Sequence, residues 1–425
     1  MKDAHVFLVR TLHLPSPHHH VVFFLRLRIA VVQYVAYERP ALSKAYLFPE
    51  APARLPGFHT TVGGGGERQD PAWYAQHDIE YLTSTRVTAA DVAAKALTTA
   101  GGDTITYDTL VVATGARPVQ LTDFSTPGAD LKGIFYLRNV VDADALLEAV
   151  AALKARGGSK VTCIGGGYIG METAAALAQH SKLDVTMVFP EGRMFERLFS
   201  PEMAAFYEAF YAYEGIKLVK GALAAGFEGD AAGHVTHTLL KGGDKVASEL
   251  VVVGVGARPN VELFKGQLDL VEGPPGGIKT DASLRTSHPD VYAVGDIAAF
   301  PLKVDGGAVN RQEHVTNARL SAAHAVADML ERGSAGDYDY QPFFYSRVFS
   351  LSWLFYGLNR GEVAHFGDLK AGKFGAYWVD KGRVVGAFLE SGTPEEFAAI
   401  KKVAAAQPAA PADLAAQGLA FASKL

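Results

Sequence analysis

The chain has 425 residues, 49% of them hydrophobic, which is enough for about two to four domains with cores of their own. A formal net charge of −5 gives no electrostatic reason to expect nucleic acid as a partner. The single cysteine, Cys163, excludes a disulfide framework, a cysteine-rich zinc site and a redox-active cysteine pair. The most apolar early run, 21–36, is short and interrupted by Arg26 and Arg28, so no membrane-spanning segment is expected.

The first 36 residues are unusual in composition. They contain no glycine, the first in the chain being Gly57, and no acidic residue lies between Asp3 and Glu38. The alternation of apolar and polar residues over 24–29 predicts a strand. We interpret the three histidines at 18–20 as a solvated loop rather than a metal site, because successive side chains of an extended segment point to opposite faces.

The stretch from Tyr37 to Lys44 is polar, aromatic and charged beside a proline. It suits either an ordinary loop or a site in which Arg39 and Lys44 lie near a phosphate or a flavin. Four glycines at 63–66 are not followed by the Gly-Lys-Ser/Thr of a P-loop. Helices are expected at 70–77 and 142–154, and strands at 79–82 and 105–110, the last leading into Ala113-Thr114-Gly115.

The strongest signal lies between Lys160 and Glu191. A short apolar strand leads into Gly165-Gly166-Gly167-Tyr168-Ile169-Gly170, an alanine-rich helix follows, and a second strand covers 184–189. Gly-x-Gly-x-x-Gly at the first turn of such a βαβ unit is typical of a dinucleotide site, with the pyrophosphate on the helix N-terminus. At the tip of the second strand, Glu191 can accept hydrogen bonds from a ribose 2′-hydroxyl, which favours NAD(H) over NADP(H).

Downstream of this unit, a helix is expected at 201–213 and strands at 216–219, 235–240 and 250–253. The last strand runs into Gly254-Val255-Gly256-Ala257-Arg258-Pro259, which echoes 113–118 and suggests two related nucleotide-binding halves.

The segment 291–296 is a strand that ends in Gly-Asp, where Asp296 can bind a ribityl hydroxyl, and a helix is expected at 311–330. Strands at 343–353, 375–379 and 383–389 indicate a further, aromatic-rich domain. We interpret the tail at 403–416 as surface helix and linker.

The order of these motifs resembles the two-dinucleotide flavoprotein reductases, and residues 37–425 resemble the monodehydroascorbate reductases within them. The resemblance rests on YERPALSKAYLFPEAPARLPGFHT, FYLR, MVFPE, RLFSPEMAAFYE, FPLK, EHVTNARLSA, FYSRVFSLSW, FLESGTPEE and FASKL. It implies that NADH reduces a bound FAD, which then gives single electrons to two ascorbyl radicals. The lack of a cysteine pair agrees with this activity, because disulfide-reducing relatives need one.

The resemblance also implies a set of site residues. Contacts to FAD are expected from Arg39, Lys44, Val87, Arg138, Asp296, Val315 and Tyr345. Contacts to NAD are expected from Gly165, Gly166, Gly167, Tyr168, Ile169, Gly170, Met171, Glu191, Arg197 and Gly256, with Glu313 and His314 flanking the nicotinamide. The ascorbyl radical would meet Arg319 and Tyr345, and the catalytic group would be Lys44, Glu172 and Tyr345, with Glu172 paired to Lys44.

Four of these assignments have a plain structural alternative. Arg319 would instead pair with Glu313, Tyr345 would be core, Arg197 would be a surface residue, and His314 would be a buried, hydrogen-bonded histidine.

The expected fold class is therefore α/β, with two Rossmann-like (three-layer ββα) nucleotide-binding domains and a C-terminal α+β domain. The FAD-binding domain would comprise 1–145 and 281–333, the NAD-binding domain 146–280, and the C-terminal domain 334–425. Residues 1–36 depart from the resemblance, because the first βαβ unit with its own glycine fingerprint is incomplete. Either the chain lacks that half of its flavin site, or the sequence start does not represent the functional protein.

Two other functions stay open. One is an NADH-dependent reductase that passes electrons to a ferredoxin-type iron–sulfur protein, and the other is a flavin-poor NADH-binding protein with little activity. A small-molecule substrate is expected, with no nucleic acid or membrane partner, and the oligomeric state is not predicted. The terminal Ser423-Lys424-Leu425 matches a peroxisomal address, so the peroxisome is the expected location, with the cytosol as an additional one.

Overall fold

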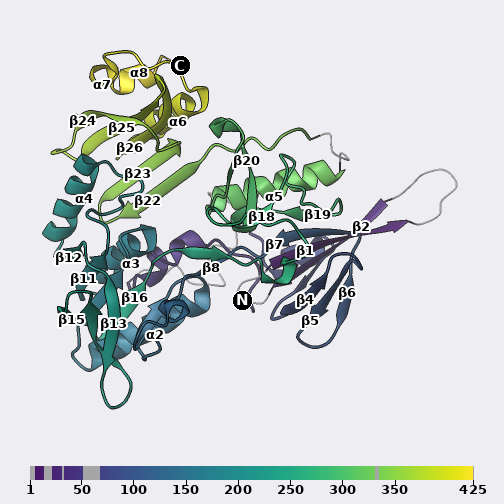
Figure 1. The fold of residues 1–425 in the computed structure, drawn as a ribbon, viewed down its shortest axis with the longest axis horizontal. Coiled ribbons are helices and arrows are strands. Elements are labelled where there is room, and N and C mark those ends of the chain that lie inside the picture. The colour runs from purple at the N-terminus through teal and green to yellow at the C-terminus, as the bar shows by residue number, and fades with distance from the viewer. Residues whose placement is uncertain (1–4, 14–21, 31–32, 51–67, 331–334, 425) are drawn as a thin grey trace. The chain divides into compact units, whose positions relative to one another are not determined.

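The computed structural model describes residues 5–13, 22–30, 33–50, 68–330 and 335–424 (Figure 1). Two compact units divide the chain. The first unit comprises 1–38, 54–117 and 257–340, and the second comprises 39–53, 118–256 and 341–425. The predicted boundaries of three domains are not tested by this division and stay a prediction. The histidines at 18–20 and the glycines at 63–66 lie outside the described residues.

The first unit is built on a five-stranded sheet in the order β19-β7-β1-β2-β3. Its strands are β1 His5–His13, β2 Val22–Ala30, β3 Ile79–Leu82, β7 Thr109–Ala113 and β19 Val291–Ala293. Parallel pairing joins β2 to β3 and β7 to β19, whereas β1 is antiparallel to both of its neighbours. The strand expected at 24–29 is therefore present as β2, but β1 and β2 form an antiparallel pair and not a βαβ crossover.

Smaller elements complete the first unit. Its helices are α1 Pro71–Gln76 and α5 Val315–Leu330. Two further sheets are β4-β5-β6 (Val87–Asp91, Ala96–Thr99, Thr104–Thr106) and β18-β20-β21 (Ile278–Lys279, Ala298–Leu302, Ala308–Asn310). In α1, the Asp70 side chain accepts from the Trp73 amide and Pro71 occupies the first turn, both typical helix-start features.

The second unit contains a fully parallel sheet in the order β12-β11-β10-β16-β9. Its strands are β9 Ile134–Tyr136, β10 Lys160–Ile164, β11 Asp184–Phe189, β12 Lys217–Lys220 and β16 Leu250–Val253, and its helices are α2 Val140–Ala155, α3 Tyr168–Gln179 and α4 Pro201–Tyr213. The antiparallel sheet β13-β14-β15 (Ala224–Gly229, Val235–Leu240, Lys245–Ala247) accompanies it. This is the βαβ architecture that the sequence predicts around Gly165–Gly170, and the α/β fold class is confirmed.

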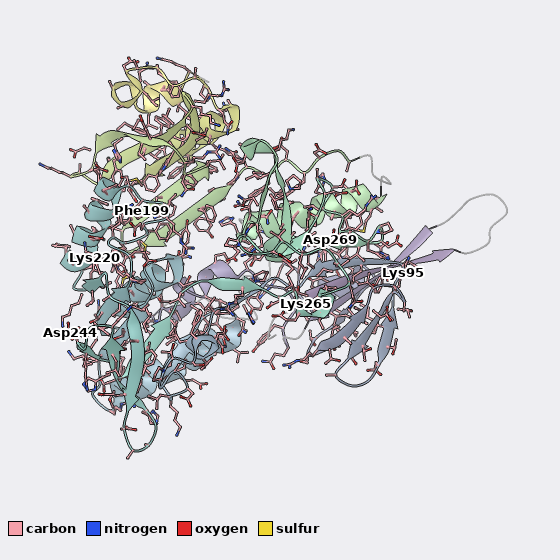
Figure 2. All side chains as sticks on the ribbon, viewed as in Figure 1. Lys95, Phe199, Lys220, Asp244, Lys265 and Asp269 are labelled. Carbon is pink, nitrogen blue, oxygen red and sulfur yellow. The ribbon has the colours of Figure 1, made fainter. Side chains whose placement is uncertain are left out.

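The C-terminal part of the second unit is an antiparallel sheet in the order β22-β23-β26-β25-β24. Its strands are β22 Phe343–Val348, β23 Leu351–Gly357, β24 Glu362–Asp368, β25 Lys373–Asp380 and β26 Arg383–Glu390. An aromatic core joins this sheet to α4. Phe199, labelled in Figure 2, stacks on Tyr207 with ring centroids 4.6 Å apart and lies 5.7 Å from Trp353.

Three expectations about this region are corrected. The strand expected at 343–353 is two strands, because the chain reverses at Phe349, whose φ is +53°. The helix expected from 311 begins at Val315. The tail is not a surface linker. Helices α6 Pro394–Ala406, α7 Leu414–Gln417 and α8 Leu419–Ala422 lie beside the sheet, and Val403, Leu414 and Phe421 are buried in its core (Figure 1).

Among the described residues, no helix is both long enough and apolar enough to cross a bilayer.

Candidate functional site

The turn between β10 and α3 forms a glycine cradle. A Cβ atom on Gly165, whose φ is +118°, would lie 2.3 Å from the carbonyl oxygen of Gly254. A Cβ atom on Gly170 would lie 1.9 Å from the carbonyl oxygen of Gly165, so both positions exclude a side chain. Gly167 differs, because nothing lies within 4 Å of its Cβ position and it caps α3 without a side-chain partner. The N-terminus of α3 is therefore open to an anionic group.

Glu191 lies two residues beyond the end of β11, the strand that pairs with β10 beside the cradle. Its Oε2 atom is buried and has no hydrogen-bond partner among the described residues. An unsatisfied buried carboxylate oxygen is costly, and a ribose hydroxyl is a donor that would satisfy it. Gly256, on the segment after β16, also has open space where a side chain would be. These features fit NAD(H), with Gly167 facing the pyrophosphate and Glu191 the adenosine ribose.

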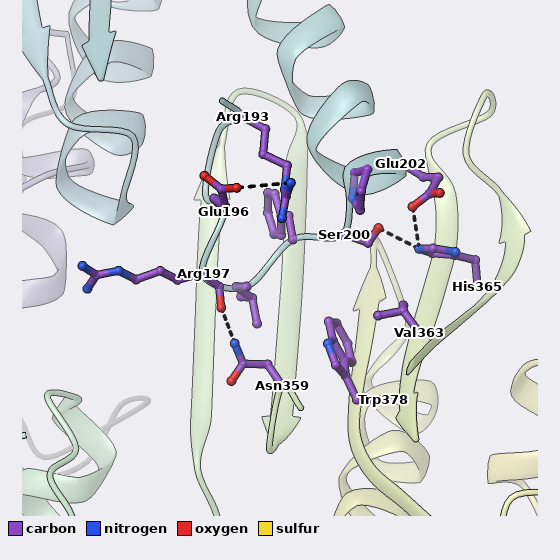
Figure 3. A pocket seen from close by; sticks show the side chains of 12 residues that line it. Arg193, Glu196, Arg197, Ser200, Glu202, Asn359, Val363, His365 and Trp378 are labelled. Atoms are coloured by element: carbon purple, nitrogen blue, oxygen red, sulfur yellow. Dashed lines mark hydrogen bonds and ion pairs between the residues drawn. The ribbon is translucent and has the colours of Figure 1, made fainter. Parts of the chain in front are cut away.

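A pocket of about 430 Å³ lies downstream of Glu191 (Figure 3). It is lined by residues of the 193–202 segment and by Asn359, Val363, His365 and Trp378. Arg193 is paired with Glu196 at 3.2 Å, and Ser200 Oγ lies 2.8 Å from His365 Nε2. The backbone carbonyl of Arg197 accepts a hydrogen bond from Asn359, and its exposed side chain points away from the other labelled residues. Arg197 is thus available to a ligand.

A second cluster in the same unit surrounds Glu172, on α3. Lys44 Nζ lies 2.7 Å from Glu172 Oε2, so the predicted pair is present. Ser43 donates to the same oxygen, and Ser346 on β22 donates to Oε1 at 2.8 Å. The Lys44 ammonium also lies 5.8 Å from the ring centroid of Tyr345, which is half-buried and so is not a full core residue.

The negative charge of Glu172 affects two nearby phenols. Burial raises the pKa of Tyr168 well above its usual value of 10, and repulsion by Glu172 raises it further. The pKa of Tyr211 is raised by the same two causes in the same order. Both phenols therefore stay protonated at neutral pH, and neither acts as a base.

The remaining predicted flavin contacts in the second unit lie on short segments. Arg39 begins a 3₁₀ turn at Arg39–Ala41, and Arg138 precedes α2, its backbone amide donating to Asp142 at 3.1 Å. Both side chains are partly exposed.

In the first unit, Asp296 follows β19 in the 3₁₀ turn Gly295–Ile297 and is 7% exposed. Arg311 donates to the backbone carbonyl of Asp296 at 2.9 Å, and the Gly295 amide donates to Ser321 on α5 at 2.9 Å. These bonds hold the Gly-Asp turn against the start of α5. Val87, the other predicted flavin contact here, is buried at the start of β4.

The residues predicted to flank the nicotinamide and the substrate surround the same end of α5. His314 is half-buried, and its Nδ1 accepts from the Thr316 amide at 3.2 Å, while Val315 begins the helix. Glu313 pairs with Arg311 at 2.5 Å, and Arg319 forms its ion pair with Glu38. The expected alternative of an Arg319–Glu313 pair is therefore wrong.

The ADP end of a flavin has a poor match in the first unit. The carboxyl ends of β2 and β7, at Ala30 and Ala113, flank His5 at the beginning of the reversed strand β1. In a Rossmann unit a glycine turn and a helix N-terminus stand at this edge. Within 5–13 and 22–30 the described residues contain neither a glycine nor a helix. Among the described residues of the first unit, buried Asp296 fits a ribityl hydroxyl, whereas 5–13 and 22–30 offer no glycine turn or helix N-terminus for the pyrophosphate.

Sequence reasoning missed several residues of these clusters, namely Ser43, Ser346, Arg193 and Glu38. Ser43 lies beside Lys44 and Ser346 beside Tyr345, so adjacency to a predicted residue is the only sequence signal for either serine. Arg193 follows Glu191 by two residues, and Glu38 lies next to Arg39.

One mixed sheet, one fully parallel sheet, a glycine cradle and a lysine–glutamate pair are together typical of a nicotinamide-dependent flavoprotein reductase. Residues 22–322 match the family described as pyridine nucleotide-disulphide oxidoreductase, and 341–422 match the monodehydroascorbate reductase 3-like C-terminal domain. The chain is 53% identical over 398 residues to monodehydroascorbate reductase of Pisum sativum, covering 92% of this chain and 90% of the relative. Identity to peroxisomal monodehydroascorbate reductase 1 of Arabidopsis thaliana is 52% over 398 residues, with the same coverage. The chain belongs to the monodehydroascorbate reductase family.

Solved structures agree with this fold. A ferredoxin reductase of the CYP199A2 system from Rhodopseudomonas palustris superimposes with a TM-score of 0.80 at 30% identity, covering 94% of this chain and 92% of that one. Putidaredoxin reductase in its complex with putidaredoxin gives a TM-score of 0.82 at 27% identity, with 93% and 91% covered. The prediction of an FAD- and NADH-linked oxidoreductase is confirmed at the level of the family.

Proposed function

We propose that the chain reduces the monodehydroascorbate radical to ascorbate with NADH. The observation that supports this substrate is the C-terminal domain, since residues 341–422 match a domain described for monodehydroascorbate reductases. In the balanced reaction, one NADH and one proton convert two radical anions into two ascorbate anions and NAD⁺. Bound FAD supplies the chemistry that links the steps, because a flavin accepts a hydride and releases electrons singly.

Each site residue would contact NADH, FAD or the ascorbyl radical. NADH would be held by Gly165 to Met171, Glu191, Arg197 and Gly256. Arg193, which lines the same pocket as Arg197, would be a further cation near it. The contacts to FAD would come from Arg39, Lys44, Val87, Arg138, Asp296, Val315 and Tyr345. Glu313 and His314 would flank the nicotinamide, and Arg319 and Tyr345 would orient the radical. Glu172 would keep the Lys44 ammonium in place beside the flavin.

The test of the function is a direct comparison of electron acceptors. FAD-loaded protein with NADH should consume ascorbyl radical, generated by ascorbate oxidase, faster than it reduces a [2Fe–2S] ferredoxin. The resemblance to ferredoxin reductases makes this the relevant competitor. Preference for the ferredoxin would replace the proposal with that second function.

The first prediction concerns the nicotinamide cofactor and rests on Glu191. Its buried, unpartnered Oε2 should accept a ribose 2′-hydroxyl and repel a 2′-phosphate. NADH should therefore bind more tightly than NADPH. Glu191→Ala should reduce the ratio of the two affinities by about ten-fold, because a charge-assisted hydrogen bond is lost. Glu214→Ala, which removes an exposed carboxylate at the end of α4, is the control. Equal affinities in the unmodified protein would contradict the assignment.

The second prediction concerns Arg319, whose guanidinium is held by Glu38. Arg319→Ala should slow radical reduction by about ten- to a hundred-fold, the usual effect of one lost charge-assisted hydrogen bond, and leave flavin reduction by NADH intact. Stopped-flow absorbance separates the two half-reactions. Glu38→Gln is the matched variant, because it removes the competing carboxylate and should preserve radical reduction. If only the NADH half-reaction fails in Arg319→Ala, Arg319 does not bind the radical.

The third prediction concerns the terminal tripeptide. Relatives of the chain include proteins named peroxisomal and others named cytosolic. Ser423 and Lys424 are exposed, as a receptor-read address requires. A fluorescent protein fused upstream of the chain should enter peroxisomes, and removal of the last three residues should leave it in the cytosol. The same distribution with and without the tripeptide would show that it is not read.

A further inference from the structure

The carboxylate of Glu172 is held on both of its oxygens. Oε2 accepts hydrogen bonds from the Lys44 ammonium at 2.7 Å and from the Ser43 hydroxyl, and Oε1 accepts one from the Ser346 hydroxyl at 2.8 Å. Glu172 is 4% exposed, Ser43 4% and Ser346 1%, so water cannot easily replace either serine. A buried carboxylate needs such donors, and here two of the three are hydroxyls with no assigned role.

The two serines come from different parts of the chain. Ser43 directly precedes Lys44, so its bond to Glu172 fixes the backbone from which the lysine side chain extends. Ser346 lies on β22, 174 residues from Glu172, inside the segment that matches the C-terminal domain. In the sheet it pairs with Trp353, which is fully buried in the aromatic core, so its position is rigid.

Their geometry determines how the carboxylate can move. With a donor on each oxygen, Glu172 cannot rotate about its terminal bond without breaking a hydrogen bond. Removing the Ser346 hydroxyl leaves Oε1 buried without a donor among the described residues. The carboxylate would then turn toward the remaining donors, and the position of the Lys44 ammonium would change with it.

We propose that Ser346 and Ser43 are positioning residues that hold the Lys44 ammonium through Glu172. Through Ser346, the C-terminal domain thereby sets the place of a charge in the nucleotide-binding part of the second unit. As far as this charge acts on a flavin, the inference rests on the proposed function. The positioning itself does not, because it concerns only contacts within the protein.

The first measurement is therefore independent of substrate and cofactor. Lysines of the full chain are acetylated with limiting acetic anhydride, and mass spectrometry compares Lys44 with the exposed Lys154 as an internal reference. Ser346→Ala should raise the relative labelling of Lys44 several-fold, and Glu172→Gln should raise it at least as much. Ser352→Ala is the matched control, because Ser352 is a half-buried serine on the neighbouring strand whose hydroxyl makes no hydrogen bond within the described residues. Unchanged labelling of Lys44 in Ser346→Ala would overturn the proposal.

The second measurement concerns the bound flavin. In FAD-loaded Ser346→Ala, flavin reduction by NADH should slow by about ten-fold at saturating NADH, with an unchanged KM for NADH, and the flavin reduction potential should fall. Ser43→Ala removes the hydroxyl on the other oxygen and gives a second variant if Ser346→Ala folds poorly. Increased Lys44 labelling without any change in flavin reduction or potential would overturn the role toward the flavin. Loss of radical reduction alone, with both readouts as expected, would instead count against the proposed substrate.

Discussion

Purified without added cofactor, the chain is expected to contain well under one FAD per protein. The reversed strand β1 begins at the edge of the sheet where, in a Rossmann unit, the first strand ends in a glycine turn and helix that meet the pyrophosphate. Loss of two main-chain donors to a charged group, at about 1.5–3 kcal/mol each, would weaken FAD binding by more than about a hundred-fold. Asp296 and Lys44, the other groups proposed to contact FAD, would serve only its flavin end. The flavin-to-protein absorbance ratio, before and after adding FAD, measures this loss.

Supplying a glycine turn and helix at this edge of the sheet should raise the flavin content. Replacement of residues 1–36 by a βα segment with Gly-x-Gly-x-x-Gly should give a stoichiometric yellow protein and raise the NADH-dependent rate in proportion. The same segment with its glycines changed to valine is the control, since it supplies the strand and helix without the close approach of the backbone. A fully loaded flavoprotein from the unaltered chain would show that residues 1–36 bind the ADP moiety in another way.

Sequence reasoning succeeded where a local pattern has one structural solution. The strand, glycine turn and helix at 160–179 follow from residues that are neighbours in the chain, and the structure has them within a few residues of the prediction. The position of Glu191 just beyond β11 follows from the length of that strand, whereas its contact with NAD(H) stays a prediction. Glu172 was paired with Lys44 only through a family resemblance, since 128 residues separate them.

The misses share a physical cause, which is that they depend on contacts between distant segments. Ser346 contacts Glu172 because β22 packs against α3, and no local sequence pattern around either residue predicts that contact. Leu414 and Phe421 belong to an alanine-rich stretch that resembles a linker, yet both are buried against the C-terminal sheet. The reversal of β1 was equally hidden, because an alternating strand has no intrinsic direction relative to its partners.

The two glycines of the cradle should separate folding from NADH binding. In Gly170→Ala the new methyl group would lie 1.9 Å from the carbonyl oxygen of Gly165, which is backbone and cannot move aside cheaply. Overpacking of this kind costs about 1–3 kcal/mol or more, so both the melting temperature and the NADH affinity should fall. In Gly167→Ala nothing within 4 Å opposes the methyl group, and the φ of −95° suits alanine.

Gly167→Ala should therefore keep most of its stability, losing under about 1 kcal/mol because alanine is a poorer N-cap than glycine. Its methyl group would stand where the pyrophosphate must approach the backbone, so NADH should bind at least about ten-fold more weakly. Thermal unfolding and titration by NADH fluorescence measure the two effects, with Gly101→Ala, in an exposed turn of the first unit, as the control. Unaltered NADH affinity in a folded Gly167→Ala protein would show that the N-terminus of α3 is not part of the NADH site. The unpartnered oxygen of Glu191 would then need another explanation.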